Sequence, residues 1–318
     1  MSGLSSKTPV TLVTGFLGSG KTTLISRLLA HPDLGETAVI VNELGEIGID
    51  HHLLRQVDER TVLLDSGCVC CTLRGDLADE LRDLDSRRAR GEVPDFRRVV
   101  VETTGIADPA PIVSTLAAEP VVRHRFALDG VVTAVDARNG LAHPESVKQA
   151  AVADVIVLTK VDVAEPDGLE RILRALNPAA EIVEAAFGDV EPTRVIGRPH
   201  RDLRPVEPGE PVHAEIRSFY VVLDEPLDWT AFGIWLTMLL QARGADLLRV
   251  KGLLDVGADG PLLLNGVQHV VSPPEHLDAW PDDDRRSRIV FIGRGIDRGE
   301  VEASLLAFNR AAAGRVVA

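Results

Sequence analysis

The segment that most constrains the fold of this chain is Gly15–Thr23, with the sequence GFLGSGKTT. It fits the spacing G-x-x-x-x-G-K-[ST], it follows an apolar run at Val10–Thr14, and a helical pattern starts at Thr22. A glycine-rich turn in this position lets backbone N–H groups converge on a phosphate at a helix N-terminus, whose partial positive charge favours an anion. The segment therefore predicts a phosphate-binding loop between a buried strand and a helix.

Two side chains of this loop carry specific expectations. Lys21 is expected to neutralise the β- and γ-phosphates of a nucleotide, and the Thr22 hydroxyl is expected to ligate Mg²⁺. A glycine-rich turn with an incidental lysine is the alternative, which the flanking strand and helix patterns disfavour. The predicted nucleotide contacts of the loop are Gly15, Phe16, Leu17, Gly18, Ser19, Gly20, Lys21, Thr22 and Thr23.

Short β-branched runs alternate with longer amphipathic stretches through the first two-thirds of the chain. Several runs, such as RVVVE and DVIVLT, are nearly continuous in Val and Ile, which is typical of a sheet covered on both faces. The pattern predicts an α/β fold, with the parallel sheet of a P-loop NTPase flanked by helices. The expected strands are Val10–Thr14, Ala38–Val41, Thr61–Leu64, Arg98–Glu102, Gly130–Val135, Val155–Thr159 and Glu181–Val183, and the expected helices are Thr22–Ala30, Leu77–Arg90, Pro109–Ala118, Glu145–Ala153 and Asp167–Leu176.

A proline-rich segment divides the chain. Gly197–Pro211 holds four prolines and has neither helical nor strand periodicity, so it predicts a linker at 198–211 between a nucleotide-binding domain, 1–197, and a smaller α+β domain, 212–318. The run Val212–Leu223 alternates with period two, as a half-buried strand does. A stripe at helical spacing is expected to pack in the core of this domain: Trp229, Phe232, Trp235, Leu236, Leu239 and Leu240.

Two later motifs follow apolar strands of the first domain. In VVVETTG, Glu102 is the expected carboxylate that holds Mg²⁺, directly or through water, and Gly105 lets its backbone N–H approach the γ-phosphate. The alternative for Glu102 is a cap on the helix that starts near Asp108. In TKVD, the Asp162 carboxylate can accept hydrogen bonds from guanine N1–H and its exocyclic amine, which adenine cannot donate from the same positions.

The same motif includes Thr159 and Lys160, and Lys160 is expected to lie over the purine face. Coming after a phosphate loop and a carboxylate strand, TKVD favours GTP over ATP as the nucleotide.

All three cysteines of the chain stand in one short turn: Cys68, Cys70 and Cys71. Because the carboxyl ends of parallel strands meet at one edge of a sheet, this turn and the acidic loop Val41–Asp50 are expected near the nucleotide. Zn²⁺ takes thiolate, imidazole or carboxylate ligands in a tetrahedral set, so Glu43, a histidine or water could complete the shell. Cys70 is a third ligand or points elsewhere. A redox pair and plain buried packing are the alternatives.

The composition of the chain argues against several functional classes of protein. The net charge of −14 disfavours nucleic acid and anionic membranes as partners. No apolar run reaches the about 18 residues that span a bilayer, and the N-terminus lacks the pattern of a signal peptide. We therefore expect a cytoplasmic protein, in whose reducing environment clustered cysteines bind metal more often than they form disulfides.

Together these motifs resemble the CobW-type metallochaperone GTPases, within the G3E group of P-loop GTPases. The matching stretches are GFLGSGKTT, VNELGEIGID, GCVCC, ETTGIADP and TKVD, followed by LLRVKGLL, NGVQHV and RIVFIGR in the second domain, and they cover about residues 8 to 308. The resemblance implies handling of zinc or cobalt, dependent on GTP and Mg²⁺, for delivery to a client metalloprotein. It also implies the metal ligands Cys68, Cys70, Cys71 and Glu43.

Three departures from the family pattern stand out. Leu44 replaces a common Phe, Thr159 stands where many GTPases have Asn, and no His-rich stretch is present. The last departure argues against high-capacity metal storage.

The sequence thus predicts a GTPase whose metal affinity depends on the bound nucleotide, with GTP and Mg²⁺ ordering the Glu43–Asp50 loop. Either Asp50, the catalytic candidate, or Glu46 orients the attacking water. Two rivals are a P-loop kinase acting on a small molecule, and a nucleotide-binding metal or redox sensor without catalysis. The metal, the client and a homo-oligomeric state stay open.

Overall fold

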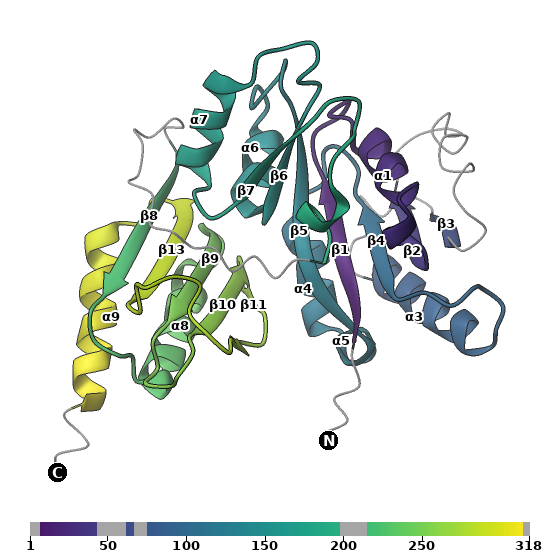
Figure 1. Ribbon diagram of the computed structural model, residues 1–318. Helices are drawn as coiled ribbons and strands as arrows, with labels where there is room; N and C mark the ends of the chain where they lie inside the picture. The colour runs from purple at the N-terminus through teal and green to yellow at the C-terminus, as the bar shows by residue number, and fades with distance from the viewer. Residues whose placement is uncertain (1–6, 43–61, 67–74, 198–214, 314–318) are drawn as a thin grey trace. The chain divides into compact units, whose positions relative to one another are not determined.

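The computed structural model describes residues 7–42, 62–66, 75–197 and 215–313 (Figure 1). The chain divides into two compact units, Met1–Glu170 with Ala180–Pro199 and Arg171–Ala179 with His200–Ala318. The division passes through helix α7, Asp167–Leu176. The linker predicted at 198–211 lies outside the described residues, so its position stays a prediction.

The first unit is built on a seven-stranded sheet in the order β3-β2-β4-β1-β5-β6-β7. Every described pairing in it is parallel. The fold class predicted from the alternation of strand and helix patterns is therefore confirmed. The strands are β1 (Thr8–Thr14), β2 (Thr37–Asn42), β3 (Val62–Ser66), β4 (Arg98–Glu102), β5 (Phe126–Asp136), β6 (Val155–Thr159) and β7 (Glu181–Ala185).

Helices complete this unit because the sheet is apolar on both faces. Leu24, Ile25, Leu28 and Leu29 of α1 are buried in one cluster with valines of six strands, from Val39 in β2 to Val183 in β7. Near-continuous valine runs thus bury their alternate side chains on opposite faces. The helices are α1 (Lys21–Leu29), α3 (Gly75–Ala89), α4 (Pro109–Ala118), α5 (Pro120–Arg125), α6 (Pro144–Val152) and α7, with short 3₁₀ turns at Pro32–Leu34 and Pro192–Arg194.

Strand register brings the functional motifs to one edge of the sheet. Val13 at the end of β1 is level with Glu102 at the end of β4, and Glu102 is level with Val41 in β2. On the side of β4 away from β1, strand β2 ends at Asn42, which is paired with Ser66, the last residue of β3. The start of the phosphate loop, Glu102 and the strand ends Asn42 and Ser66 therefore all lie at this carboxyl edge.

The second unit contains an antiparallel sheet in the order β11-β10-β9-β13-β8, with β12 paired to β10. Its inner face packs against α8 and α9 around Val221, Phe291, Phe232 and Leu305. The elements are β8 (Ile216–Leu223), α8 (Trp229–Arg243), β9 (Leu247–Leu254), β10 (Leu262–Val267), β11 (Val270–Val271), β12 (Glu275–His276), β13 (Ser287–Arg294) and α9 (Arg298–Ala313). The prediction of a smaller C-terminal α+β region is confirmed.

Several details differ from the expectations. Trp229 is 41% exposed, because it is the first residue of α8, whereas Phe232, Trp235 and Leu236 are buried as expected. Strand β5 begins at Phe126 rather than Gly130, since Phe126 is paired with Thr8 at the start of β1. Helix α5 was not expected because its six residues are too few for a helical periodicity. Among the described helices, none is both long enough and apolar enough to cross a membrane.

Candidate nucleotide site

The loop between β1 and α1 has the backbone shape that its glycines predict. Gly15 has φ +144°, and a Cβ there would lie 2.4 Å from the Ala134 carbonyl oxygen. Gly20 is the N-cap of α1 with φ +88°, in the left-handed region that favours glycine. The loop therefore wraps tightly against β5 and ends with the N-terminus of α1 open to an anion.

Lys21 lies within the curve of this loop. Its Nζ donates hydrogen bonds to the carbonyl oxygens of Gly15, at 2.8 Å, and Phe16, at 3.2 Å. The side chain is only 8% exposed. A buried ammonium held against the backbone of the loop adds positive charge where phosphate oxygens would gather.

Thr22 and Glu102 come together from α1 and the end of β4. The Thr22 hydroxyl donates to Glu102 Oε1 at 3.0 Å, across 80 residues of sequence, and Glu102 is only 2% exposed. Hydroxyl and carboxylate oxygens are the ligands that Mg²⁺ prefers, so this pair fits the ion. The N-cap of α4 is Asp108, which accepts a hydrogen bond from Ala110 N at 3.0 Å. Glu102 therefore does not serve as that cap.

Gly105 lies directly against the phosphate loop. A Cβ on Gly105 would be 2.5 Å from the Leu17 backbone nitrogen and 2.7 Å from Leu17 Cδ2, so no other residue fits without displacement. The nearby Thr103 is tied to β1: its N–H donates to the Val13 carbonyl at 3.0 Å and its hydroxyl to Thr14 Oγ1 at 2.9 Å. The segment after β4 is thus fixed beside the place where a γ-phosphate would lie.

The TKVD residues contact the phosphate loop from the other side. The Thr159 hydroxyl donates to the Ser19 carbonyl at 2.6 Å, and Lys160 Nζ donates to the Gly18 carbonyl at 2.7 Å. Lys160 has φ +60°, a left-handed backbone that is uncommon for a residue with a Cβ. Asp162, in contrast, is exposed. The motif is therefore anchored by its first two residues, while the aspartate stays open to a ligand.

Asp136 was missed in the sequence, although it ends the apolar run of β5. Its Oδ2 accepts hydrogen bonds from Lys160 Nζ at 2.7 Å and Asn139 Nδ2 at 2.9 Å, and Oδ1 accepts one from Arg138 N at 2.8 Å. Burial alone raises the pKa of this carboxyl, but these hydrogen bonds, that from Lys160 foremost, outweigh it and hold the pKa below its usual value. Asp136 thus stays ionised and fixes Lys160.

The loop after β7 was also missed. Gly188 approaches α1 so closely that a Cβ there would be 3.1 Å from the Thr23 carbonyl oxygen. The neighbouring Phe187 has φ +53° and is 68% exposed. The left-handed backbone and the exposed ring of Phe187 are visible only in the structure, so the sequence AAFGD alone does not mark this loop as a neighbour of α1.

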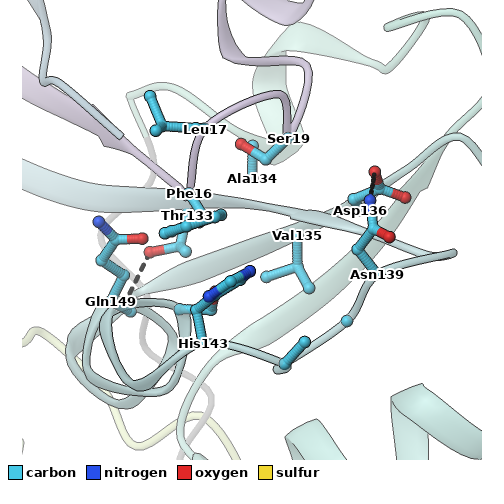
Figure 2. Close-up of a pocket in the computed structure, with 13 residues that line it drawn as sticks. Phe16, Leu17, Ser19, Thr133, Ala134, Val135, Asp136, Asn139, His143 and Gln149 are labelled. Carbon is cyan, nitrogen blue, oxygen red and sulfur yellow. Dashed lines mark hydrogen bonds between the residues drawn. The ribbon is translucent and has the colours of Figure 1, made fainter. Parts of the chain in front are cut away.

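A pocket of about 200 Å³ lies on the β5 and α6 side of the phosphate loop (Figure 2). Two of the lining rings, those of Phe16 and His143, stack directly on one another with centroids 4.0 Å apart. Thr133 and Gln149 lie at one end, and Asp136 and Asn139 at the other. The pocket therefore connects the phosphate loop with the residues that hold Lys160.

The predicted transition-metal ligands Cys68, Cys70, Cys71 and Glu43, and the catalytic candidate Asp50, lie outside the described residues. Within the described part of the chain, no group of three or more His, Cys, Asp or Glu side chains could hold a metal ion. The structure therefore bears on these residues only through the strand ends at Asn42 and Ser66 that precede them.

The chain is similar to known proteins over both units. Residues 9–184 match the nucleotide-binding domain described as CobW/HypB/UreG, and residues 216–309 match the C-terminal domain of the cobalamin synthesis protein CobW. The zinc chaperone YjiA of Escherichia coli K12 is 34% identical over 317 residues, which cover 95% of this chain and 98% of YjiA.

Two solved structures show the same overall similarity. The crystal structure of Zn(II)-bound YjiA GTPase from E. coli has a TM-score of 0.71 at 30% identity and covers 95% of this chain and 99% of that chain. A Zn(II)-bound triple mutant of YjiA, with one glutamate and two cysteines changed to alanine, has a TM-score of 0.72 at the same identity and coverage.

Proposed function

The chain belongs to the CobW/HypB/UreG family of P-loop GTPases, and on that premise we propose that it is a metallochaperone. It binds a transition metal ion, holds it with an affinity that depends on GTP or GDP, and delivers it to a client protein in the cytoplasm. The observation that carries the proposal is the carboxyl edge of the sheet. At that edge Glu102, at the end of β4, accepts a hydrogen bond from Thr22, and the next two strands, β2 and β3, end at the paired residues Asn42 and Ser66.

Hydrolysis takes place at the phosphate loop. A water oxygen forms a bond to the γ-phosphorus while the bond to the β–γ bridging oxygen breaks, and GDP leaves with that oxygen. Backbone N–H groups of the loop and the Lys21 ammonium stabilise the charge that gathers on the transferred group. Thr22 and Glu102 would hold Mg²⁺, which would supply positive charge against the phosphates. Asp50 orients the attacking water, and Glu46 is the other candidate.

Guanine recognition falls to the TKVD motif. The exposed Asp162 carboxylate accepts hydrogen bonds from N1–H and the exocyclic amine of guanine. Lys160, held at its Nζ by Asp136 and Gly18, lies over the base. Thr159 replaces asparagine yet still bonds the Ser19 carbonyl, so the departure from the common motif keeps a link to the phosphate loop.

The cargo is zinc or cobalt, bound by thiolates of Cys68, Cys70 and Cys71 with the Glu43 carboxylate. Glu43 follows Asn42 and the cysteine turn follows Ser66, and these two strand ends are paired neighbours. Three strand spacings, about 14 Å in all, separate β3 from β1. A short turn and loop can cross that distance, which is what coupling to the nucleotide requires. The relative YjiA is named a zinc chaperone, which favours zinc over cobalt.

Coupling between nucleotide and metal requires that the protein bind the metal with different affinities in its GTP-bound and GDP-bound states. GTP with Mg²⁺ orders the Glu43–Asp50 loop and brings Glu43 toward the thiolates, and hydrolysis releases that loop and loosens the metal. Reciprocity requires that zinc in turn tighten GTP binding relative to GDP by the same factor.

A metal titration tests the proposal. Purified protein under reducing conditions is titrated with Zn²⁺ against a chromophoric chelator, in the presence of a non-hydrolysable GTP analogue or GDP. We expect tighter binding with the analogue, and loss of this difference when Cys68, Cys70 and Cys71 are changed to serine. Equal affinities in the two nucleotide states would remove the chaperone function and leave a GTPase. Phosphate released from GTP without any added acceptor distinguishes the proposal from the kinase rival.

A further inference from the structure

The position of Gly105 is fixed by contacts with two elements, the phosphate loop and helix α6. On one side it lies so close to Leu17 of the phosphate loop that a methyl group on its Cα would come within 2.5 Å of the Leu17 nitrogen. On the other side its carbonyl oxygen accepts a hydrogen bond, at 3.1 Å, from Nε2 of Gln149 in helix α6. Glycine has the largest backbone freedom of any residue, so a functional Gly105 N–H needs such external restraint.

Gln149 is arranged to supply that restraint. Its side chain is fully buried, and its Nε2 donates to two carbonyls of the same segment, Gly105 at 3.1 Å and Ala107 at 3.0 Å. Both hydrogens of the amide group are thereby used on the loop that follows β4. The backbone of Gln149 is itself fixed, since its carbonyl accepts a hydrogen bond at 2.9 Å from Thr133 in β5 (Figure 2).

A packing role does not explain this side chain. Gln149 Oε1 is buried and has no hydrogen-bond partner among the described residues. An unpaired buried acceptor is destabilising, whereas methionine has the same length and leaves no amide oxygen unpaired. The part of Gln149 that methionine cannot replace is the pair of hydrogen bonds to Gly105 and Ala107.

We propose that Gln149 is a positioning residue that lets the site distinguish GTP from GDP. By holding the Gly105 and Ala107 carbonyls toward α6, it fixes the Gly105 N–H for the γ-phosphate, so that the γ-phosphate meets a donor already in place. GDP has no γ-phosphate and gains nothing from this arrangement. The inference rests on the proposed role of Gly105 in the site, and it assigns no contact between Gln149 and the nucleotide itself.

The test compares nucleotide affinities in the full-length protein. Gln149→Met removes both hydrogen bonds at constant length, and Gln149→Glu places a carboxylate against two carbonyl oxygens. The matched control is Ser146→Ala, which lies one turn earlier in α6 and is buried with a hydroxyl that has no partner among the described residues. Dissociation constants are measured for GDP and for a non-hydrolysable GTP analogue with Mg²⁺, together with kcat and KM for GTP.

For both Gln149 variants we expect GDP affinity within about twofold of the wild type, while the affinity for the GTP analogue and kcat fall about tenfold. Ser146→Ala should change neither. Equal losses for both nucleotides, or no loss for either, would overturn the inference. Gly105→Ala distinguishes a failure of the proposed role of Gly105 from a failure of the role of Gln149. If this variant leaves the preference for the GTP analogue intact, the proposed role of Gly105 fails. If it abolishes the preference while Gln149→Met does not, only the role of Gln149 fails.

Discussion

The two ends of the proposed nucleotide site are built differently. At the proposed phosphate end, the backbone of one short loop and the side chains that join it, Lys21 and Thr22, belong to a single motif. At the base end, side chains from two neighbouring strand ends meet: Asp136, the last residue of β5, accepts a hydrogen bond from Lys160, which follows β6, and Thr159 and Lys160 both donate to the phosphate loop. The phosphate end is therefore built mainly from one local motif, which Glu102 and Gly105 complete from the end of β4, whereas the base end depends on contacts between separate motifs.

This difference has consequences for substitution. A change at the phosphate end removes charge or a ligand from the reacting group, so it should lower the rate most. A change at the base end weakens the choice of nucleotide or the hold on Lys160 and should leave the chemistry itself less affected. Three substitutions test that ordering, and a fourth measures how much the hold on Lys160 contributes to stability.

The largest effect is expected for Lys21→Ala. Loss of the ammonium that Gly15 and Phe16 hold in the loop should lower kcat about 10³-fold, since it stabilises charge on the transferred phosphoryl group. Phosphate release at saturating GTP measures it. Lys148→Ala in α6 removes the same charge outside the loop and should leave kcat unchanged. A similar loss in both variants would mean that general electrostatics, and not the position of Lys21, sets the rate.

Thr22→Ala should lower kcat about 10²-fold and raise the Mg²⁺ concentration needed for half-maximal rate, because it removes the hydroxyl that donates to Glu102. Thr22→Ser keeps that hydroxyl and should restore most of the activity. Rates measured across a Mg²⁺ titration separate a metal effect, which excess Mg²⁺ partly rescues, from a general loss of the fold. No rescue by serine would contradict the assigned role.

At the base end, Asp162→Asn should exchange nucleotide preference and leave the maximal rate nearly intact. The amide can donate to the extra carbonyl of xanthine but no longer accepts two hydrogen bonds from guanine. We expect about a 30-fold loss in kcat/KM for GTP and a gain for XTP. Competition between the two nucleotides measures the ratio. An unchanged ratio would place guanine recognition elsewhere.

The smallest effect concerns Asp136 and its hydrogen bond to Lys160. Because the pKa of Asp136 is lower in the folded protein than in the unfolded chain, its stabilising contribution is present above about pH 4 and is lost as the pH falls further. Asp136→Asn should therefore lower the free energy of unfolding by about 1 kcal/mol at pH 7. The value is modest because Lys160 is 41% exposed.

Denaturant unfolding at a series of pH values checks this prediction. The difference between the wild type and Asp136→Asn should shrink as the pH is lowered through about 4. A difference that stays constant with pH would mean that the variant acts through packing and not through the charge of Asp136.

The same contrast explains how much the sequence could predict. The phosphate loop, Glu102 and Gly105 stand in short motifs with fixed spacing, so their joint placement follows from the order of a parallel sheet. Asp136 stands in no short motif. Its role depends on a hydrogen bond from Lys160, which follows the neighbouring strand β6, and only the fold brings the two residues together. Gln149 was missed for the same reason: a glutamine inside an amphipathic helix gives no sign that its amide reaches a loop 44 residues earlier.

In the second unit, helical spacing correctly placed Phe232 and Trp235 in the core but also included Trp229. Periodicity identifies a helix face, whereas burial at a helix end depends on what packs there, and Trp229 is the first residue of α8.

The central claim is that the metal-binding turn responds to the state of the phosphate loop, and single-turnover metal release tests it most directly. Protein loaded with Zn²⁺ and GTP is mixed with a chromophoric chelator, and zinc transfer and phosphate formation are followed in the same sample. We predict one shared rate constant for both events, and Lys21→Ala should slow both together. Zinc that leaves at the same rate with GTP, its non-hydrolysable analogue and GDP would contradict the account.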